Sequence, residues 1–190
     1  MLKLMMPIVG IILLWGPWSP AAFSMEKIDH GMLDPMMRSL NHTTWGYQII
    51  KGDKNSPARY IERFEVRSGD CFANRSWNDC PEDRERSELS EKNKTTQSGD
   101  QRWYHWQFYL PESFMDIYPT KVTLGQFHQL HSHPAWMFEL NHHGYWLEEH
   151  LHSRHKLTKK LISSEQLKGH WQDILVWVIW QRNHQGRLKV

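Results

Sequence analysis

The sequence predicts an all-β sandwich, and three observations support this prediction. Short segments in which apolar and polar residues alternate recur along the chain, with turn signals between them. No segment repeats apolar residues at the spacing of an amphipathic helix. The chain has 190 residues, enough for one domain with a hydrophobic core, and its 11 tryptophans suit either such a core or the stacking of sugar rings.

Residues 1–24 are typical of a secretory signal peptide. A short positive region precedes the apolar stretch Leu4–Trp15, and Ala22 and Ser24 stand at the spacing of a cleavage site. The apolar stretch is short for a membrane span, although an uncleaved anchor is the alternative. We expect a secreted or periplasmic protein that leaves the membrane when the signal is removed, with one domain over residues 25–190.

The net charge limits the kind of ligand that we expect, and the two cysteines bear on the cellular compartment. The formal net charge is only +2, so no global field attracts nucleic acid, and an acidic ligand must be held by a local cluster. We expect a monomer. Cys71 and Cys80 are the two cysteines, and in an exported chain we expect them to form one disulfide, with two free thiols as the alternative.

The first half of the chain predicts short strands. Trp45–Ile50 is a short strand, and the turn cluster Gly52–Pro57 follows it. Tyr60–Arg67 alternates, with Phe64 and Val66 on one side, which predicts a half-buried strand.

Arg102–Leu110 predicts a dense aromatic strand. One face carries Tyr104, Trp106 and Phe108, and the other Trp103, His105, Gln107 and Tyr109. Because both faces hold large rings, we expect both to be covered, one by the core and one by ligand or loops.

The second half predicts further strands. Asn141–Gly144 has the composition of a hairpin turn, and the near-continuous apolar run Trp171–Trp180 predicts a strand that is central or buried on both faces. The other expected strands are Trp136–Leu140, Tyr145–Glu149, part of Leu157–Leu167, and the start of one at Arg187–Val190. Eight histidines fall between His128 and His155, but no carboxylate stands at a ligand spacing from them, so we assign no metal site.

Two further segments carry candidate chemistry. In a strand over Val122–Leu130, alternation places Gln126 and His128 on one face, together with Leu124. If Arg84–Leu89 is extended, its face presents the polar side chains Arg84, Arg86 and Glu88.

An arginine, an amide and an imidazole suit β-elimination on a uronic acid. Neutralising the carboxylate stabilises the enolate-like intermediate, and a histidine near neutrality can take the C5 proton. The alternative is a buried Gln–His pair that hydrogen-bonds to the backbone, and spacing alone does not decide between them.

The motifs Arg86-Ser87-Glu88-Leu89 and Gln126-Phe127-His128 resemble the R-[ST]-E-L and Q-x-H motifs of jelly-roll polysaccharide lyases of the alginate lyase-like group. The wider pattern from about residue 45 onward looks closer to the heparin lyase I and glucuronan lyase type. That pattern includes Arg63–Arg67, the Cys71–Cys80 loop and Trp103–Pro111.

This resemblance implies a concanavalin-like β-jelly roll of two antiparallel sheets that cleaves an anionic polysaccharide of the glucuronan, heparin or alginate kind. Arg86 and Gln126 would neutralise the uronate, and His128 would be the base or assist it. Expected substrate-binding residues are Arg63, Arg67, Arg84, Glu88, His105 and Gln107. The chemistry needs no cofactor, and the resemblance allows for a structural calcium ion with no ligands assigned.

The sequence departs from the family pattern in one respect. No segment matches the Y-F-K-x-G-x-Y motif whose tyrosine supplies the proton, so we expect the last strands to be missing from the chain. Tyr145 is a conceivable substitute, but nothing in its sequence context supports that role. A carbohydrate-binding sandwich without activity is therefore one alternative. A glycoside hydrolase is another, but it requires two carboxylates on one strand face, and neither Glu62 and Glu65 nor Glu148 and Glu149 share a face.

Overall fold

The computed structural model describes residues 36–38, 41–91, 96–115, 117–129, 132–152, 155–182 and 185–190. The expected signal peptide and Leu130 lie outside these residues. Within them the helical segments are two short 3-10 turns, η2 (Cys80–Glu82) and η3 (Ser164–Gln166). No helix in the described part of the chain has the length and apolar character needed to cross a membrane.

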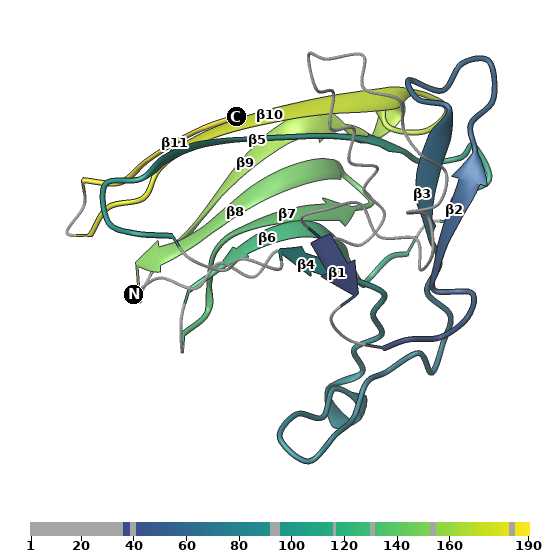
Figure 1. Ribbon diagram of the computed structural model, residues 1–190, viewed down its shortest axis with the longest axis horizontal. Helices are drawn as coiled ribbons and strands as arrows, with labels where there is room; N and C mark the ends of the chain where they lie inside the picture. Colours follow the sequence, from purple (N-terminus) through teal and green to yellow (C-terminus); the bar gives the residue numbers. More distant parts are fainter. Residues whose placement is uncertain are drawn as a thin grey trace.

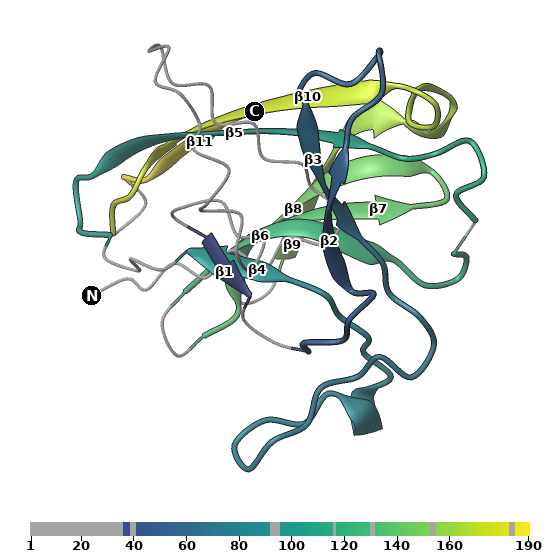
Figure 2. The same cartoon turned by 45° about the vertical axis from the view of Figure 1, so that its right-hand side comes forward.

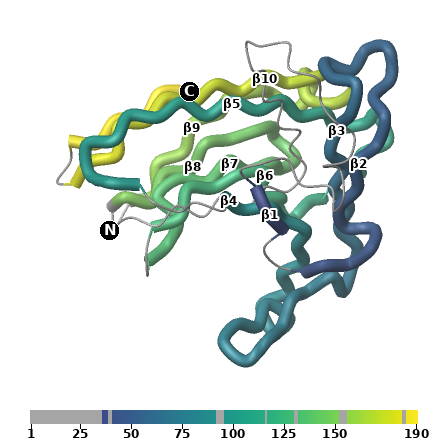
Figure 3. Tube along the Cα trace, in the orientation of Figure 1, coloured from purple at the N-terminus to yellow at the C-terminus, as the bar shows by residue number. Residues whose placement is uncertain are grey.

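Two antiparallel sheets form the body of the molecule, which confirms the predicted all-β sandwich (Figure 1). One sheet has the order β11-β10-β5, and its strands are β5 (Gln101–Tyr109), β10 (Trp171–Ile179) and β11 (Arg187–Lys189). The other is a meander of β6 (Val122–His128), β7 (Pro134–Asn141), β8 (Gly144–His152) and β9 (His155–Ser163). Figure 3 shows this meander as four successive passes of the chain beneath β5 and β10.

Two smaller strand pairs stand beside the sandwich. They are β2 (Tyr47–Lys51) with β3 (Tyr60–Phe64), and β1 (Met36–Arg38) with β4 (Leu89–Glu91). The strand predicted to continue to Arg67 thus ends at Phe64, and Val66 beyond it is exposed.

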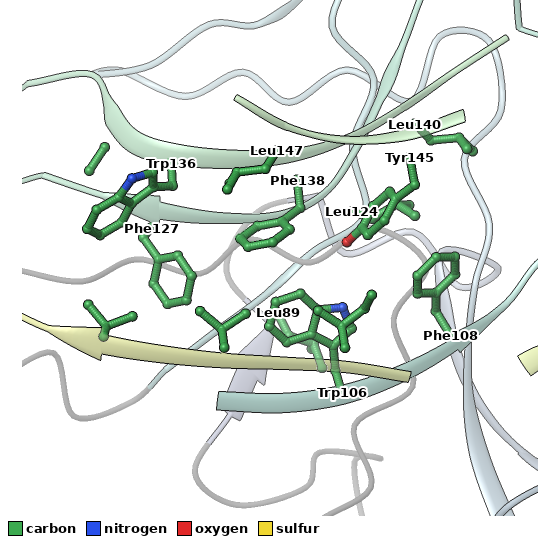
Figure 4. Packing of buried hydrophobic residues seen from close by; sticks show 14 of the residues in the cluster. Leu89, Trp106, Phe108, Leu124, Phe127, Trp136, Phe138, Leu140, Tyr145 and Leu147 are labelled. Atoms are coloured by element: carbon green, nitrogen blue, oxygen red, sulfur yellow. The ribbon is translucent and has the colours of Figure 1, made fainter. Parts of the chain in front are cut away.

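Aromatic side chains from both sheets meet in the core (Figure 4). Trp106 of β5 packs edge-on against Phe138 of β7 with ring centroids 5.0 Å apart, and Phe108 lies 4.9 Å from Tyr145. Phe127 of β6 is fully buried among rings from both layers. These contacts fix which face of every strand points inward, and therefore which residues face solvent.

The predicted hairpin is present, because β7 ends at Asn141 and β8 begins at Gly144, opposite each other in the register. Gly144 has φ 134°, and a Cβ there would lie 2.2 Å from the Ile162 carbonyl oxygen of β9. The close approach of β9 therefore requires glycine at this position.

One sequence expectation about faces was wrong. A register shift between Thr123 and Gly125 turns Leu124 into the core, so Leu124 does not share a face with Gln126. For β10, the central position among the described strands is confirmed and burial on both faces is not, because Asp173 and Leu175 on its outward face are solvent-exposed.

The expected strand over Arg84–Leu89 was also wrong for most of its length. Only Leu89 belongs to a strand, β4, and Glu85 makes a single bridge to Cys71. Backbone and side-chain bonds to neighbouring loops hold this segment in place instead: the Arg86 amide donates to the Asp70 carbonyl at 3.0 Å.

The expected disulfide between Cys71 and Cys80 is present. It closes a loop over a sequence separation of nine residues, and this loop projects from the sandwich on the side away from β5 and β10 (Figures 1 and 2).

Replacing both cysteines with serine should lower the free energy of unfolding by about 2–3 kcal/mol, because the unfolded chain gains the freedom of an unclosed loop. Urea unfolding of the double variant, beside wild type with and without reductant, measures this. Equal midpoints for the variant and the oxidised wild type would contradict it.

Candidate functional site

Gln126 precedes the buried Phe127 on β6, so its side chain points away from the core on the outward face of the four-stranded sheet. A register shift separates Phe127 from His128, and His128, the last residue of β6, lies at the edge of this face, where it also lines the cavity between the sheets. Both residues are half-buried. In the register Gln126 lies opposite Met137, which lies opposite Glu148. Glu148 therefore lies about 10 Å across the same face from Gln126, two strand spacings away.

A hydrogen bond fixes the tautomer of His128. Its Nδ1 lies 2.7 Å from the Gln129 carbonyl oxygen. A carbonyl oxygen can only accept, so Nδ1 carries the proton and Nε2 of the neutral ring is left as an acceptor. An imidazole held in this way is ready to take a proton at Nε2.

A network of two carboxylates and two ammonium groups occupies the same outward face. Lys121 Nζ donates to Glu139 Oε2 at 2.6 Å and to Glu148 Oε2 at 3.3 Å. Lys156 Nζ lies 2.5 Å from the same Glu148 oxygen. Beside this network, the Lys160 ammonium lies 5.0 Å from the centre of the Trp146 ring.

The two carboxylates have opposite pKa shifts. Burial, and then the hydrogen bond to Glu148, raise the pKa of Glu139 to about 7, with Lys121 acting against this. Burial also opposes ionisation of Glu148, but its bonds to Glu139 and Lys156 outweigh this and lower its pKa. Below about pH 7, Glu139 therefore holds a proton that it donates to Glu148. The surface then carries three ammonium groups, those of Lys121, Lys156 and Lys160, and one ionised carboxylate, that of Glu148. We call this surface, with Gln126 and His128, the lysine-rich face.

Glu139→Gln should flatten the dependence of stability on pH. Because the folded pKa is raised above its usual value of 4.5, the folded state binds this proton more tightly than the unfolded chain does. That contribution is complete below about pH 4.5 and is lost as the pH rises through about 7.

Between about pH 5 and pH 8 the stability of the variant relative to wild type should therefore rise by on the order of 2 kcal/mol. Urea unfolding across this range measures it, and parallel curves for the two proteins would contradict the raised pKa.

Arg86 lies in a compact polar cluster. Its Nη2 is 2.6 Å from Asp79 Oδ1 and its Nη1 is 3.2 Å from Glu88 Oε2, and both carboxylates are buried. Asn41 donates to the carbonyls of Arg86 and Asp70 and ties the segment to the neighbouring loop. One guanidinium between two carboxylates carries no net positive charge, which disfavours a further anion here. No hydrogen bond or ion pair among the described residues joins Arg86 to Gln126 or His128.

The other predicted basic residues are also separate from the lysine-rich face. Arg63 and Arg67 both bond to Glu65, and the Arg67 guanidinium lies 4.5 Å from the centre of the Trp45 ring. Arg84 is exposed beyond η2.

His105 and Gln107 lie on the opposite side of the core from Gln126 and His128. They point outward from β5, where both bond to Asp173 of β10, at 2.7 and 2.9 Å. The structure therefore does not bring all the predicted residues together at one site.

Tyr145 does not substitute for the tyrosine of the Y-F-K-x-G-x-Y motif. It is fully buried between Phe108 and Phe138, and burial raises the pKa of its hydroxyl far above the usual value. It therefore reaches no substrate and gives up its proton less readily than an exposed tyrosine.

Sequence reasoning missed Lys121, Glu139, Glu148 and Lys156. It compared carboxylates within single strands, whereas Glu139 and Glu148 come together diagonally across β7 and β8. The hairpin turn in the sequence could have revealed this contact, because pairing Asn141 with Gly144 determines which residues of the two strands lie opposite each other.

Glu139 and Glu148 hydrogen-bond to each other, whereas the carboxylates of a glycosidase stand at least about 5 Å apart.

A cavity of about 1040 Å³ opens between the two sheets near His128. Its lining includes core side chains such as Trp136, Leu147 and Trp180, together with His128 and Gln129. His128 therefore lies where the lysine-rich face meets the open end of the inter-sheet space. No group of three or more metal-ligating side chains is found among the described residues.

Comparison with known proteins places these features in a family. A sequence model described as polysaccharide lyase matches residues 29–190, a range that contains both short motifs and every strand of the sandwich. No curated protein and no solved structure gives a significant match.

Proposed function

This chain belongs to the polysaccharide lyase family, and from that premise we propose that it cleaves a polysaccharide containing uronic acids by β-elimination. The observation that carries this proposal is His128, whose Nδ1 proton is committed to the Gln129 carbonyl while Nε2 is left as an acceptor beside Gln126. A base and an amide donor on one sheet face are the groups that the reaction requires.

In the proposed reaction the uronate carboxylate is bound by the Gln126 amide, which stabilises the negative charge that develops on it. His128 Nε2 takes the proton from C5, and the electron pair forms a double bond between C4 and C5. The bond from C4 to the glycosidic oxygen breaks, and the imidazolium returns its proton to that oxygen. The products are a shortened chain and an unsaturated uronate.

The charge on the lysine-rich face supports an acidic substrate. Lys121, Lys156 and Lys160 outnumber the ionised carboxylates there when Glu139 is protonated. The Trp146 indole beside Lys160 adds an aromatic surface on which a sugar ring can stack. We infer that Lys121 and Lys156 exchange part of their contact with Glu139 and Glu148 for the carboxylates of a polyuronate, of the glucuronan, alginate or heparin kind.

We also propose that the protein acts outside the cytoplasm. The disulfide between Cys71 and Cys80 supports this, since such bonds persist in oxidising compartments.

A second candidate function is binding of the same polysaccharide without cleavage. It is favoured by the burial of Tyr145, whose hydroxyl does not reach the lysine-rich face. It would use the same lysine-rich face.

Incubating the purified protein separately with glucuronan, alginate and heparin distinguishes the two candidates. A growing ultraviolet absorbance from the conjugated double bond would support cleavage. Retention of the polymer without such absorbance would support binding alone, and neither result on any polymer would contradict both.

A further inference from the structure

The outward face of the three-stranded sheet carries two pairs of rings, each with one exposed ring, Trp103 or Tyr109, and one half-buried ring, Trp177 or Trp171. Trp103 of β5 lies opposite Trp177 of β10, with ring centroids 6.3 Å apart, and Tyr109 lies opposite Trp171 at 5.4 Å. Trp103 is 66% exposed, which is far more than a core tryptophan. The two pairs stand six residues apart along β5, a span of about 20 Å.

Three polar side chains and the exposed Leu175, which lies opposite His105, occupy the space between the ring pairs. Asp173 accepts hydrogen bonds from a ring nitrogen of His105 at 2.7 Å and from Gln107 Nε2 at 2.9 Å. These exposed groups hold one another in place at the centre of the strand pair, and they retain further hydrogen-bonding capacity toward solvent.

A cation completes the arrangement at one end. The Lys189 ammonium of β11 lies 5.6 Å from the centre of the Trp177 ring. The face thus presents, in order along the strands, a cation with two indoles, a set of hydrogen-bonding groups, and a second ring pair.

This order matches the chemistry of a sugar chain whose residues carry carboxylates. Pyranose rings present C–H faces that pack on indole and phenol rings, and their hydroxyls hydrogen-bond to carboxylate, imidazole and amide groups. A uronate carboxylate is the complement of the Lys189 ammonium. A span of about 20 Å accommodates several sugar rings in a row.

We propose that this surface, the outer aromatic face, is a second and non-catalytic binding site for an acidic polysaccharide. Rings of the polymer stack on Trp103 with Trp177 and on Tyr109 with Trp171, and Asp173 hydrogen-bonds to hydroxyls between them. The site lies across the hydrophobic core from His128, so it holds the polymer without cleaving it. This proposal depends on the proposed function in one respect only, namely that the sugar chain is acidic.

Affinity electrophoresis of the full chain in gels containing alginate, heparin or neutral hydroxyethylcellulose tests this proposal. Trp103→Ala is the first variant, because a side chain so exposed can be removed without disturbing the fold. Tyr118→Ala is the matched control, since this loop ring is also 66% exposed but lies outside the outer aromatic face. Lys189→Gln tests the charge.

We expect Trp103→Ala to weaken retention by alginate or heparin about tenfold and Lys189→Gln to weaken it less, while Tyr118→Ala leaves it unchanged. Release of unsaturated uronates from short oligosaccharides should persist at the wild-type level if the protein is a lyase. Retention is measured without any cleavage, so a failure of the proposed reaction leaves this result readable.

Three results would overturn the proposal. They are equal retention of wild type and Trp103→Ala, no retention of wild type by either acidic polymer, and preferential retention by the neutral polymer. A change in sedimentation mass for Trp103→Ala with unchanged retention would show that a second copy of the chain covers the face instead.

Discussion

Arg86→Ala is expected to lower the free energy of unfolding by about 3–5 kcal/mol. Asp79 and Glu88 are both buried, and each bonds to the Arg86 guanidinium, so the variant leaves two buried carboxylates without this cation. The loss should appear in urea unfolding near neutral pH.

Arg84→Ala is the matched control, because Arg84 is exposed on the same segment and should change stability by less than about 0.5 kcal/mol. If Arg86→Ala unfolds at the wild-type midpoint yet abolishes polymer cleavage, Arg86 acts on substrate as the motif implies, and the structural role derived from its ion pairs would be wrong.

His128→Ala is expected to reduce the release of unsaturated uronates by at least about 100-fold, since a positioned general base contributes roughly that much or more. The side chain is half-buried at the end of β6, so the variant should keep the unfolding midpoint of wild type within a few degrees. Initial rates of absorbance increase measure the effect.

His133→Ala controls for the removal of any nearby imidazole, because His133 is exposed just before β7. Wild-type rates in His128→Ala would remove His128 from the mechanism, whatever the family.

The sandwich and most of its strands could be predicted from the sequence alone. Alternation along β5 identified Tyr104, Trp106 and Phe108 as one face, and these rings do point into the core. The hairpin at Asn141–Gly144 followed from its turn residues. These features depend on local patterns that are visible within about ten residues of chain.

Features that depend on partners far along the chain were not predictable. The side chain of Leu124 points into the core because the register of β6 against β7 shifts there, and no residue of β6 indicates this shift in the sequence. The run at β10 was consistent with burial on both faces because Trp171, Leu175 and Trp177 count as apolar, yet Leu175 is exposed and the two tryptophans are only half-buried. Hydrophobicity alone does not distinguish a core tryptophan from one on a surface.

The candidate site shows the same division. Alternation alone placed Gln126 on the outward face, but it did not predict the register shift between Phe127 and His128 or the position of His128 at the cavity. The engagement of Arg86 with Asp79 depends on the disulfide loop folding back, and the proximity of Glu139 to Glu148 depends on the pairing of β7 with β8. Both are tertiary facts that motif spacing does not contain.

β-Elimination on a polyuronate leaves a signature in the mass of the reaction products. The protein is incubated with glucuronan, alginate or heparin, and the oligosaccharides are analysed by mass spectrometry. We expect products that carry an unsaturated uronate at the new non-reducing end and are therefore lighter by one water than the corresponding hydrolysis products. Products that all have the full mass of hydrolysis, or polymers that stay intact in every case, would show that the chain does not act by β-elimination.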